Sequence, residues 1–171
     1  RVRKVAEELL EKLIPSDDSE DTHKLMRLKR KLGWAANLHE VGMAISHSDY
    51  HKHGAYILDN ADMLGFSMQE LHRLGLLVLG HRGKLKKLET EFDEPEFAQL
   101  LLALRLAVIL CHARKDPDHK DLQLTQNRTK QSFTLSSDAD WMVRYPQSVH
   151  LLRQESLAWQ KSPWSFNFMT V

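Results

Sequence analysis

The stretch Phe97-Ala-Gln-Leu-Leu-Leu-Ala-Leu-Arg-Leu-Ala-Val-Ile-Leu-Cys111 is the most apolar part of the chain. It has 15 residues and contains Gln99 and Arg105, so it is too short and too polar to span a bilayer. It predicts instead a helix buried at the centre of the protein. Pro95 fits the first turn of this helix, where a proline costs no hydrogen bond.

Upstream of this stretch, apolar residues recur every three to four positions, which is typical of helices packed on a core. An acidic connector, Pro15 to Asp21, separates the first two predicted helices. The predicted helices begin at Val2, at Asp21 or Thr22, near His51, and at the S-x-x-E capping box Ser67–Glu70; they end near Leu13, Gly42, Asn60 and Gly80 respectively.

Downstream of Pro117 the apolar period changes to two, which is typical of strands. The alternating residues predict three short strands (Leu122 and Leu124; Phe133 and Leu135; Trp141 and Val143), then a helix after Pro146 and a last strand through Trp164, Phe166 and Phe168. The predicted fold is therefore mainly α with a small α+β C-terminal part. We expect a helical bundle over residues 1–116 and a ββ(β)αβ subdomain over residues 117–171.

Composition excludes several classes of protein. Lys and Arg number 24 and Asp and Glu 23 in 171 residues, so the net charge of +1 argues against a DNA-binding protein. Apolar and charged fractions of 42% and 27% are those of a globular protein. Cys111 is the only cysteine, which excludes an intrachain disulfide and fits a cytoplasmic protein. Because the chain begins at Arg1 and has no signal peptide, we expect a fragment of a longer protein.

Histidine is the local anomaly, because four of the ten histidines lie within the 15 residues from His39 to His53. His39 falls on the apolar stripe of its helix beside Glu40, and an imidazole with a carboxylate is a usable metal pair. An equally good interpretation is a core histidine hydrogen-bonded to a backbone carbonyl. His47, His51, Lys52 and His53 surround a predicted helix N-terminus, which suits an anion such as phosphate; the alternative is a polar loop.

A second basic group, His81 to Lys87, follows a predicted helix C-terminus. His81, Arg82 and Lys84 are phosphate-binding candidates, although cations at this position also offset the helix dipole. The chain has no P-loop, no G-x-G-x-x-G, no H-E-x-x-H and no G-x-S-x-G. Cys111 lies in the apolar helix and is expected to be inert. The residues therefore predict no catalytic set.

Several segments resemble the exopolyphosphatase / guanosine pentaphosphate phosphohydrolase family over most of the chain. They are Leu38-His-Glu-Val-Gly42, Ser46-His-Ser48, His51-Lys-His-Gly-Ala-Tyr-Ile-Leu-Asp-Asn-Ala-Asp-Met-Leu-Gly-Phe66, Leu79-Gly-His-Arg-Gly-Lys84, Leu104-Arg-Leu-Ala-Val-Ile-Leu110, Trp141 to Pro146 and Gln154 to Trp159. The stretch from His39 to Phe66 is quite specific, and its histidine spacing is nearer the exopolyphosphatase branch.

The resemblance implies a bacterial enzyme that removes terminal phosphate from polyphosphate or from pppGpp. It implies that catalysis, with Mg²⁺, belongs to an N-terminal ATPase-fold module that this chain lacks. The chain is then similar to the C-terminal part of the family, an HD-like helical domain plus a small α/β domain, which binds polyphosphate and supports a homodimer. No cofactor is expected in this part.

The HD-like comparison implies a degenerate metal site. His39-Glu40 is similar to the His-Asp pair of HD phosphohydrolases, but the first-His position falls near Arg1 and the later-Asp position near Cys111-His112. The leading hypothesis is therefore a non-catalytic region that binds polyphosphate. The alternatives are a working HD-type phosphohydrolase with metal ligands among His39, Glu40, His47 and His112, and a plain interaction domain.

Overall fold

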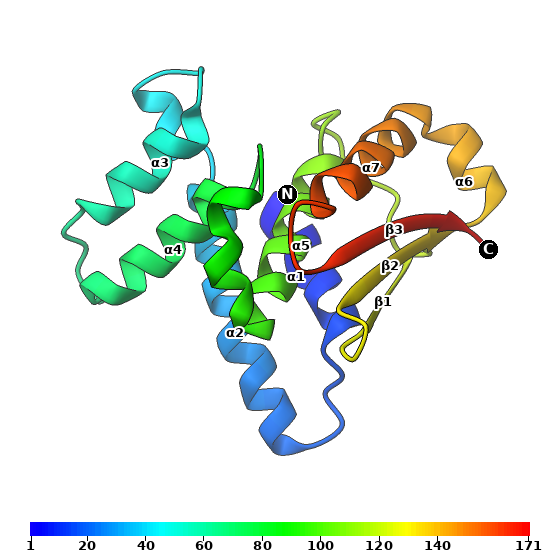
Figure 1. Cartoon of the computed structure of the whole chain (residues 1–171), viewed down its shortest axis with the longest axis horizontal. Helices are drawn as coiled ribbons and strands as arrows, with labels where there is room; N and C mark the ends of the chain where they lie inside the picture. The colour runs from blue at the N-terminus through cyan, green and yellow to red at the C-terminus, as the bar shows by residue number, and fades with distance from the viewer.

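Helix α5 (Pro95–Leu110) lies at the centre of the computed structural model, which describes residues 1–171 (Figure 1). Its side chains from Ala98 to Ala107 are all buried, as predicted for a central helix. The two polar groups on it have partners: Gln99 donates to Gln126 Oε1 at 2.9 Å, and Arg105 pairs with Glu155. The mainly α architecture with a small α+β part is confirmed.

The other helices surround α5 as the apolar spacing predicts. They are α1 (Val2–Leu13), α2 (Ser19–Leu38), the short 3-10 helix η1 (Val41–Ala44), α3 (Tyr50–Asp59), α4 (Met68–Gly80), the 3-10 helix η2 (Lys86–Asp93), α6 (Ala139–Arg144) and α7 (Pro146–Trp159). Helices α1 and α2 pack on α5, while α3 and α4 form a hairpin at one end of the molecule (Figure 1). The predicted capping box of α4 is present, since Ser67 and Glu70 each accept from the other's backbone N–H.

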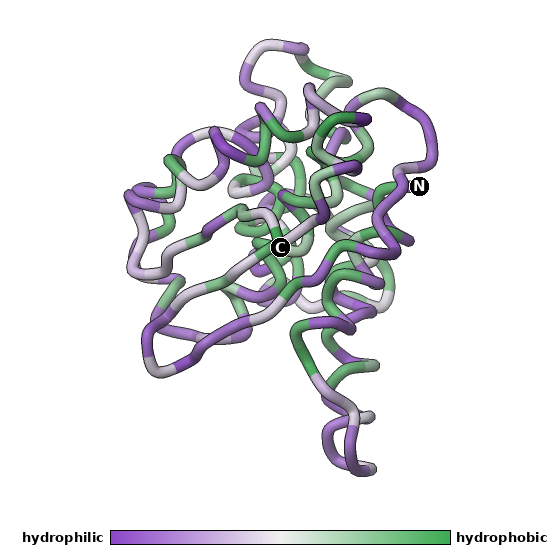
Figure 2. Tube along the Cα trace, turned by 90° about the vertical axis from the view of Figure 1, so that its right-hand side faces the viewer, coloured by the Kyte–Doolittle hydropathy of each residue, from purple (hydrophilic) through white to green (hydrophobic).

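Helix α2 begins earlier than predicted. Its N-cap is Asp18, whose side chain accepts from the N–H of Asp21 at 2.8 Å, rather than Asp21 or Thr22. Glu20 and Asp21 then lie in the first turn, where carboxylates offset the positive end of the helix dipole. The connector and this first turn form a hydrophilic projection (Figure 2).

Gly42 is not the end of α2, which stops at Leu38, but it is needed for another reason. A Cβ at this position would be 1.9 Å from the carbonyl oxygen of Tyr50 and 2.5 Å from the backbone nitrogen of Gly54. Only glycine therefore lets the first turn of α3 pack directly on η1. This close approach sets where the start of α3 lies relative to the end of α2.

The C-terminal part contains a sheet of three strands in the order β1-β2-β3, formed by β1 (Gln123–Asn127), β2 (Ser132–Ser137) and β3 (Ser165–Thr170). Strands β1 and β2 are antiparallel, with Leu124 opposite Leu135. Strand β3 is parallel to β2, with Phe133 opposite Phe166. Helices α6 and α7 form the crossover between these parallel strands, and α7 packs on β3 (Figure 1).

The prediction of a third strand at Trp141 and Val143 is wrong, because these residues lie in helix α6. Asp138 caps the helix by accepting from the N–H of Trp141 at 2.7 Å. Trp141 is 4% exposed whereas Val143 is 79% exposed. Residues two apart share a face in a strand but lie on nearly opposite sides of a helix, so the apparent alternation had no structural basis. The order is ββααβ rather than ββ(β)αβ.

One hydrophobic core joins the helical and the α+β parts, running from Val5 on α1 to Phe166 on β3. Lys12 of α1 donates to the carbonyl groups of His119, Lys120 and Leu122, which tethers the segment leading into β1. Burial is the main cause that lowers the pKa of Lys12. No helix in the protein is both long enough and apolar enough to cross a membrane.

Candidate anion-binding site

Three buried histidines meet where α2 ends, α3 begins and α4 ends. The ring centroid of His81 is 5.1 Å from that of His39 and 6.5 Å from that of His51. The ring of Tyr50 lies 5.4 Å from His81, and His47 lies 5.8 Å from Tyr50. Residues from three helices are thus gathered into one aromatic and imidazole cluster, which we call the histidine cluster (His39, His47, Tyr50, His51 and His81).

Two of these imidazoles are anchored to helix C-termini. His39 is the C-cap of α2, and its Nδ1–H donates to the carbonyl of Ala36 at 2.6 Å. His81 is the C-cap of α4, and its Nδ1–H donates to the carbonyl of Val78. These carbonyls belong to the last helical turn, where the α-helical pattern no longer supplies backbone donors, and the Val78 carbonyl also accepts from the backbone N–H of His81 at 3.4 Å. In a neutral ring whose donor proton is on Nδ1, as in His81, the Nε2 atom is an acceptor.

Burial keeps two of the imidazoles neutral. It is the main cause that lowers the pKa of His81 to about 3 and that of His51 to about 4. Lys87 and Arg82 lower the pKa of His51 further, while Asp49 opposes them. His51 Nδ1 and His81 Nε2 are both buried without a hydrogen-bond partner. At neutral pH these two predicted phosphate ligands therefore carry no positive charge.

The positive charge of the site comes instead from lysine and arginine side chains next to Tyr50 and His51. The Arg82 guanidinium stacks on the ring of Tyr50 at 4.6 Å, and Lys52 lies 3.7 Å from Asp49. Burial, followed by the charge of Arg105, lowers the pKa of Lys87 to about 8. We call Lys52, Arg82 and Lys87 the basic rim. Arg82 and Lys87 form no ion pair, so both remain available to an anion.

Arg105 of α5 stabilises the loop that carries Arg82 by hydrogen bonds to its backbone. Its Nη1 donates to the carbonyl of Gly80 at 2.7 Å and to that of Gly83 at 3.2 Å. Gly83 has a φ of +81°, and a Cβ there would lie 3.4 Å from His51 Nε2 and 3.5 Å from Lys87 Nζ. A left-handed backbone that approaches both side chains favours glycine. The loop is thereby pressed against the start of α3.

Sequence reasoning missed Tyr50 and Arg105, and it placed Lys87 in the second basic group without selecting it as a ligand. The one available signal was Arg105, a lone cation in the most apolar helix, which requires a buried partner. That partner is Glu155 of α7, which accepts from Arg105 Nε at 2.6 Å and from Nη2 at 2.8 Å. No local pattern links residues that are 50 positions apart.

Not all predicted ligands join the site. No hydrogen bond, ion pair or ring contact connects His53 or Lys84 to the basic rim. His112 lies beside Ser148 of α7, with Nε2 3.2 Å from the hydroxyl oxygen. His39 Nε2 is 3.8 Å from Glu40 Oε1, but no group of three His, Cys, Asp or Glu side chains is placed to hold a metal ion. Burial raises the pKa of the Cys111 thiol, which favours its unreactive form.

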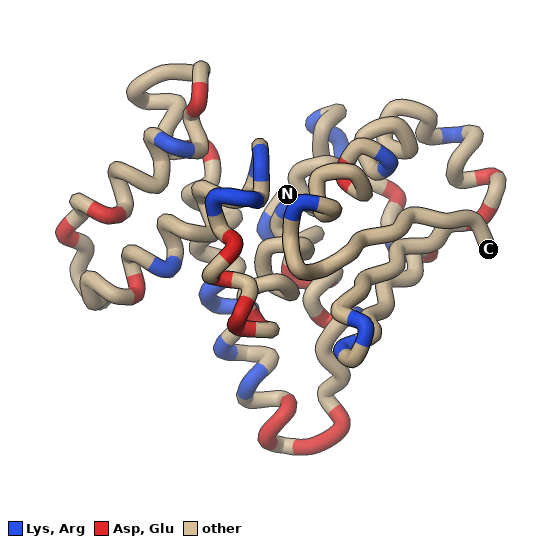
Figure 3. Tube along the Cα trace, viewed as in Figure 1, with Lys and Arg blue, Asp and Glu red and all other residues tan.

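The charge around the site is strongly divided along the chain. Figure 3 shows Lys and Arg on the loop after α4 and at the start of η2, followed by Asp and Glu through the rest of η2. The near-zero net charge of the protein therefore conceals a basic surface next to an acidic one. An anion is attracted to the first and repelled by the second, which orients its approach.

Comparison with known proteins identifies a matching family and several relatives. It matches the family described as "Ppx/GppA phosphatase, domain III" over residues 1–158. It is 36% identical to a guanosine-5'-triphosphate,3'-diphosphate pyrophosphatase of Pseudoalteromonas translucida over 75% of this chain. Proteins of the same name from Vibrio cholerae and Aeromonas hydrophila are each 30% identical, over 75% and 96% of this chain. The chain covers only 26% to 33% of the length of these three relatives.

Proposed function

The chain belongs to the Ppx/GppA phosphatase family, whose domain III it contains, and from this premise we propose that it binds the phosphate-rich substrate of a bacterial phosphoric-anhydride hydrolase. The proposed substrate is inorganic polyphosphate, from which the parent enzyme removes terminal phosphate. In this proposal catalysis takes place in an N-terminal ATPase-fold module, which supplies Mg²⁺ and works together with this region.

The observation that carries the proposal is the basic rim. Lys52, Arg82 and Lys87 come from two separate segments and converge beside the start of α3. Asp49 is the one carboxylate in ion-pair contact with them, and it reaches only Lys52. Cations that remain unpaired although they repel one another favour an anionic ligand. In this proposal the neutral imidazoles of His51 and His81 support the structure of the site and do not bind phosphate.

A second candidate substrate is pppGpp, because the relatives described above carry the name of a pppGpp pyrophosphatase. The histidine spacing favours the exopolyphosphatase branch instead. Both substrates are chains of phosphoric anhydrides, so the same basic rim fits either. The difference is length: polyphosphate extends over many cations, whereas pppGpp offers two short phosphate groups. Pairing of two copies of the chain also remains a prediction.

The test is binding of the 171-residue chain to polyphosphate and to pppGpp at several salt concentrations. We expect polyphosphate to bind at low salt and to be released as salt rises, by analogy with nucleic-acid backbones. Arg82→Ala and Lys87→Ala are each expected to lower the salt-dependence slope by about 1. Lys130→Ala, which removes an exposed cation in the β1–β2 turn, is the matched control and should bind normally.

Three outcomes contradict parts of this proposal. Equal retention of the Arg82→Ala, Lys87→Ala and parent chains would exclude the basic rim as the site. Tighter binding of pppGpp than of long polyphosphate would favour the second candidate. Steady Mg²⁺-dependent phosphate release by this chain alone would place catalysis here and not in another module.

A further inference from the structure

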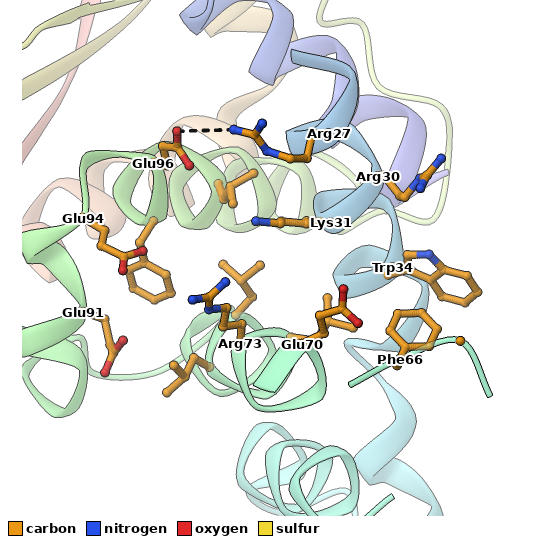
Figure 4. A pocket seen from close by; sticks show the side chains of 16 residues that line it. Arg27, Arg30, Lys31, Trp34, Phe66, Glu70, Arg73, Glu91, Glu94 and Glu96 are labelled. Atoms are coloured by element: carbon orange, nitrogen blue, oxygen red, sulfur yellow. Dashed lines mark ion pairs between the residues drawn. The ribbon is translucent and has the colours of Figure 1, made fainter. Parts of the chain in front are cut away.

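A second concave site lies away from the basic rim, between α2, α4 and the start of α5 (Figure 4). Its volume is about 680 Å³, which is within the usual range for sites that bind small molecules. Its floor is apolar and is formed by Leu74, Leu77 and Leu100. Nothing in the proposed phosphate site uses this cavity, so its lining requires a separate explanation.

The cavity carries unpaired charges of both signs. Lys31 of α2 and Arg73 of α4 extend into it from opposite walls, whereas Glu91 and Glu94 stand together at one end (Figure 4). None of these four side chains forms an ion pair. The neighbouring Glu96, by contrast, lies within ion-pair distance of both Lys24 and Arg27. Over the whole lining the cations and the carboxylates also balance, since Arg27, Arg30, Lys31 and Arg73 stand against Glu70, Glu91, Glu94 and Glu96. The cavity therefore suits a ligand without net charge whose own charges are separated.

The end opposite the two glutamates is aromatic. Trp34 and Phe66 meet edge to face there, with ring centroids 5.1 Å apart (Figure 4). Trp34 is 38% exposed, although large aromatic side chains usually bury most of their surface. Glu70 also lies near this end, but its carboxylate accepts from the backbone N–H of Ser67 in the α4 capping box at 2.7 Å (Figure 4). The cavity therefore presents an aromatic end with this engaged carboxylate beside it, then two cations, and then a pair of free carboxylates.

We propose that this cavity binds a small zwitterion with an aromatic or apolar body, of the kind represented by short peptides with free termini. The apolar side chain would lie against Trp34 and Phe66, the carboxylate between Lys31 and Arg73, and the ammonium group at Glu91 and Glu94. Nucleotides and polyphosphate are disfavoured, because their excess negative charge would face the two glutamates. This proposal is independent of the phosphate-binding proposal.

The probe is the dipeptide L-alanyl-L-phenylalanine, whose groups follow the order of the cavity. Its titration is observed by calorimetry and by tryptophan fluorescence of the 171-residue chain. The other three tryptophans, Trp141, Trp159 and Trp164, are at most 4% exposed, so Trp34 is the responsive fluorophore. We expect saturable binding with a Kd on the order of 0.1 to 1 mM. Trp34→Phe should abolish the fluorescence change.

Variants and blocked peptides separate the two charged ends. Arg73→Met should weaken binding of the free dipeptide about tenfold, and Glu94→Gln should do the same, because each removes one half of the charge match. N-acetylation of the dipeptide should remove the effect of Glu94→Gln, and amidation of its carboxylate that of Arg73→Met. Lys130→Met is the matched control, since Lys130 is an exposed cation in the β1–β2 turn that does not line the cavity, and binding should be unchanged.

Each remaining outcome overturns the proposal. Absence of saturation at roughly 10 mM dipeptide would show that the cavity is not a zwitterion site. Equal binding of the free and doubly blocked peptides would show that the charges are irrelevant. Tighter binding of GTP with a Trp34 response would show that the cavity selects anions. Thermal unfolding of every variant, which we expect to match that of the parent chain, verifies that these exposed or half-exposed substitutions leave the fold intact.

Discussion

At the scale of single residues, the histidine cluster shows how burial changes what an imidazole can do. Histidines near lysine and arginine are attractive phosphate ligands as long as they can be protonated. His51 and His81 are 5% and 2% exposed, and their pKa values fall to about 4 and about 3. These two imidazoles therefore contribute packing and no charge. The positive charge of the candidate site is carried by Lys52, Arg82 and Lys87.

The lowered pKa values predict how stability depends on pH. An unfolded chain protonates these imidazoles near pH 6.5, whereas the folded chain resists protonation until pH 4 or below. Stability is therefore complete above pH 6.5 and is lost as the pH falls toward 4. Each group contributes a slope of up to about 1.4 kcal/mol per pH unit in this window. Urea denaturation at a series of pH values measures it.

The matched variants of this experiment are His81→Gln and His150→Gln. Replacing His81 removes one buried titration, so the loss of stability between pH 6 and pH 4 should become shallower. His150 is exposed on α7, and its replacement should leave the slope unchanged. Identical pH profiles for the parent chain and His81→Gln would contradict the assignment of His81 as a neutral, buried group.

At the scale of elements, one ion pair connects three helices and the candidate site. Arg105 of α5 is 6% exposed and Glu155 of α7 is 5% exposed. Arg105 also holds the carbonyls of Gly80 and Gly83, and Glu155 also accepts from Trp159 Nε1 at 2.9 Å. Helix α7 of the α+β part thereby supports the loop that carries Arg82.

Breaking this pair should be strongly destabilising. Arg105→Met leaves the Glu155 carboxylate buried without its cation, and we expect a loss of about 3–5 kcal/mol in the free energy of unfolding. Adding Glu155→Leu should recover part of that loss, because the isolated charge is then also removed. Chemical denaturation of the single and double variants provides the coupling energy.

A surface pair provides the control for this prediction. Arg144 and Asp118 lie 3.1 Å apart, but their side chains are 54% and 38% exposed. Arg144→Met should therefore cost only about 0–1 kcal/mol. An Arg105→Met variant that is no less stable than Arg144→Met would show that α7 and the loop do not depend on the buried pair.

At the scale of the whole molecule, the helical and α+β parts share one core. Helix α1 contacts both α5 and β1, and buried apolar residues continue from α1 to β3 without interruption. Proteins built on one core usually unfold in a single transition. The division into residues 1–116 and 117–171 remains a prediction about sequence organisation, and unfolding behaviour tests whether it is also physical.

We expect one cooperative unfolding transition for the whole chain. Far-UV circular dichroism follows mainly the helices, whereas tryptophan fluorescence follows largely Trp141, Trp159 and Trp164 in the C-terminal part. The two signals should give the same midpoint in urea. Residues 1–116 expressed alone should unfold at a lower urea concentration, because the apolar surface under β1 and α7 becomes exposed. Two separate transitions would contradict the single core.

Local patterns predicted most of the architecture from sequence alone. The apolar run determined α5, the three-to-four spacing determined the helices around it, and the capping box determined the start of α4, because these signals depend on neighbours within a turn or two. The one wrong element, α6, had too few residues for its period to be distinguished. The histidine-rich segments were also identified as the region of a site.

Only the tertiary structure decided how that site works. It brings His39, His51 and His81 together from three helices, and it buries two of them deeply enough to keep them neutral. It also selects Lys87 from the second basic group and adds Tyr50 and the support of Arg105, which lies 50 residues from its partner Glu155. Burial and long-range pairing depend on which surfaces meet when the chain folds. Charge state is a consequence of that packing, so residue type alone could indicate a candidate phosphate site but could not show which of its side chains are charged.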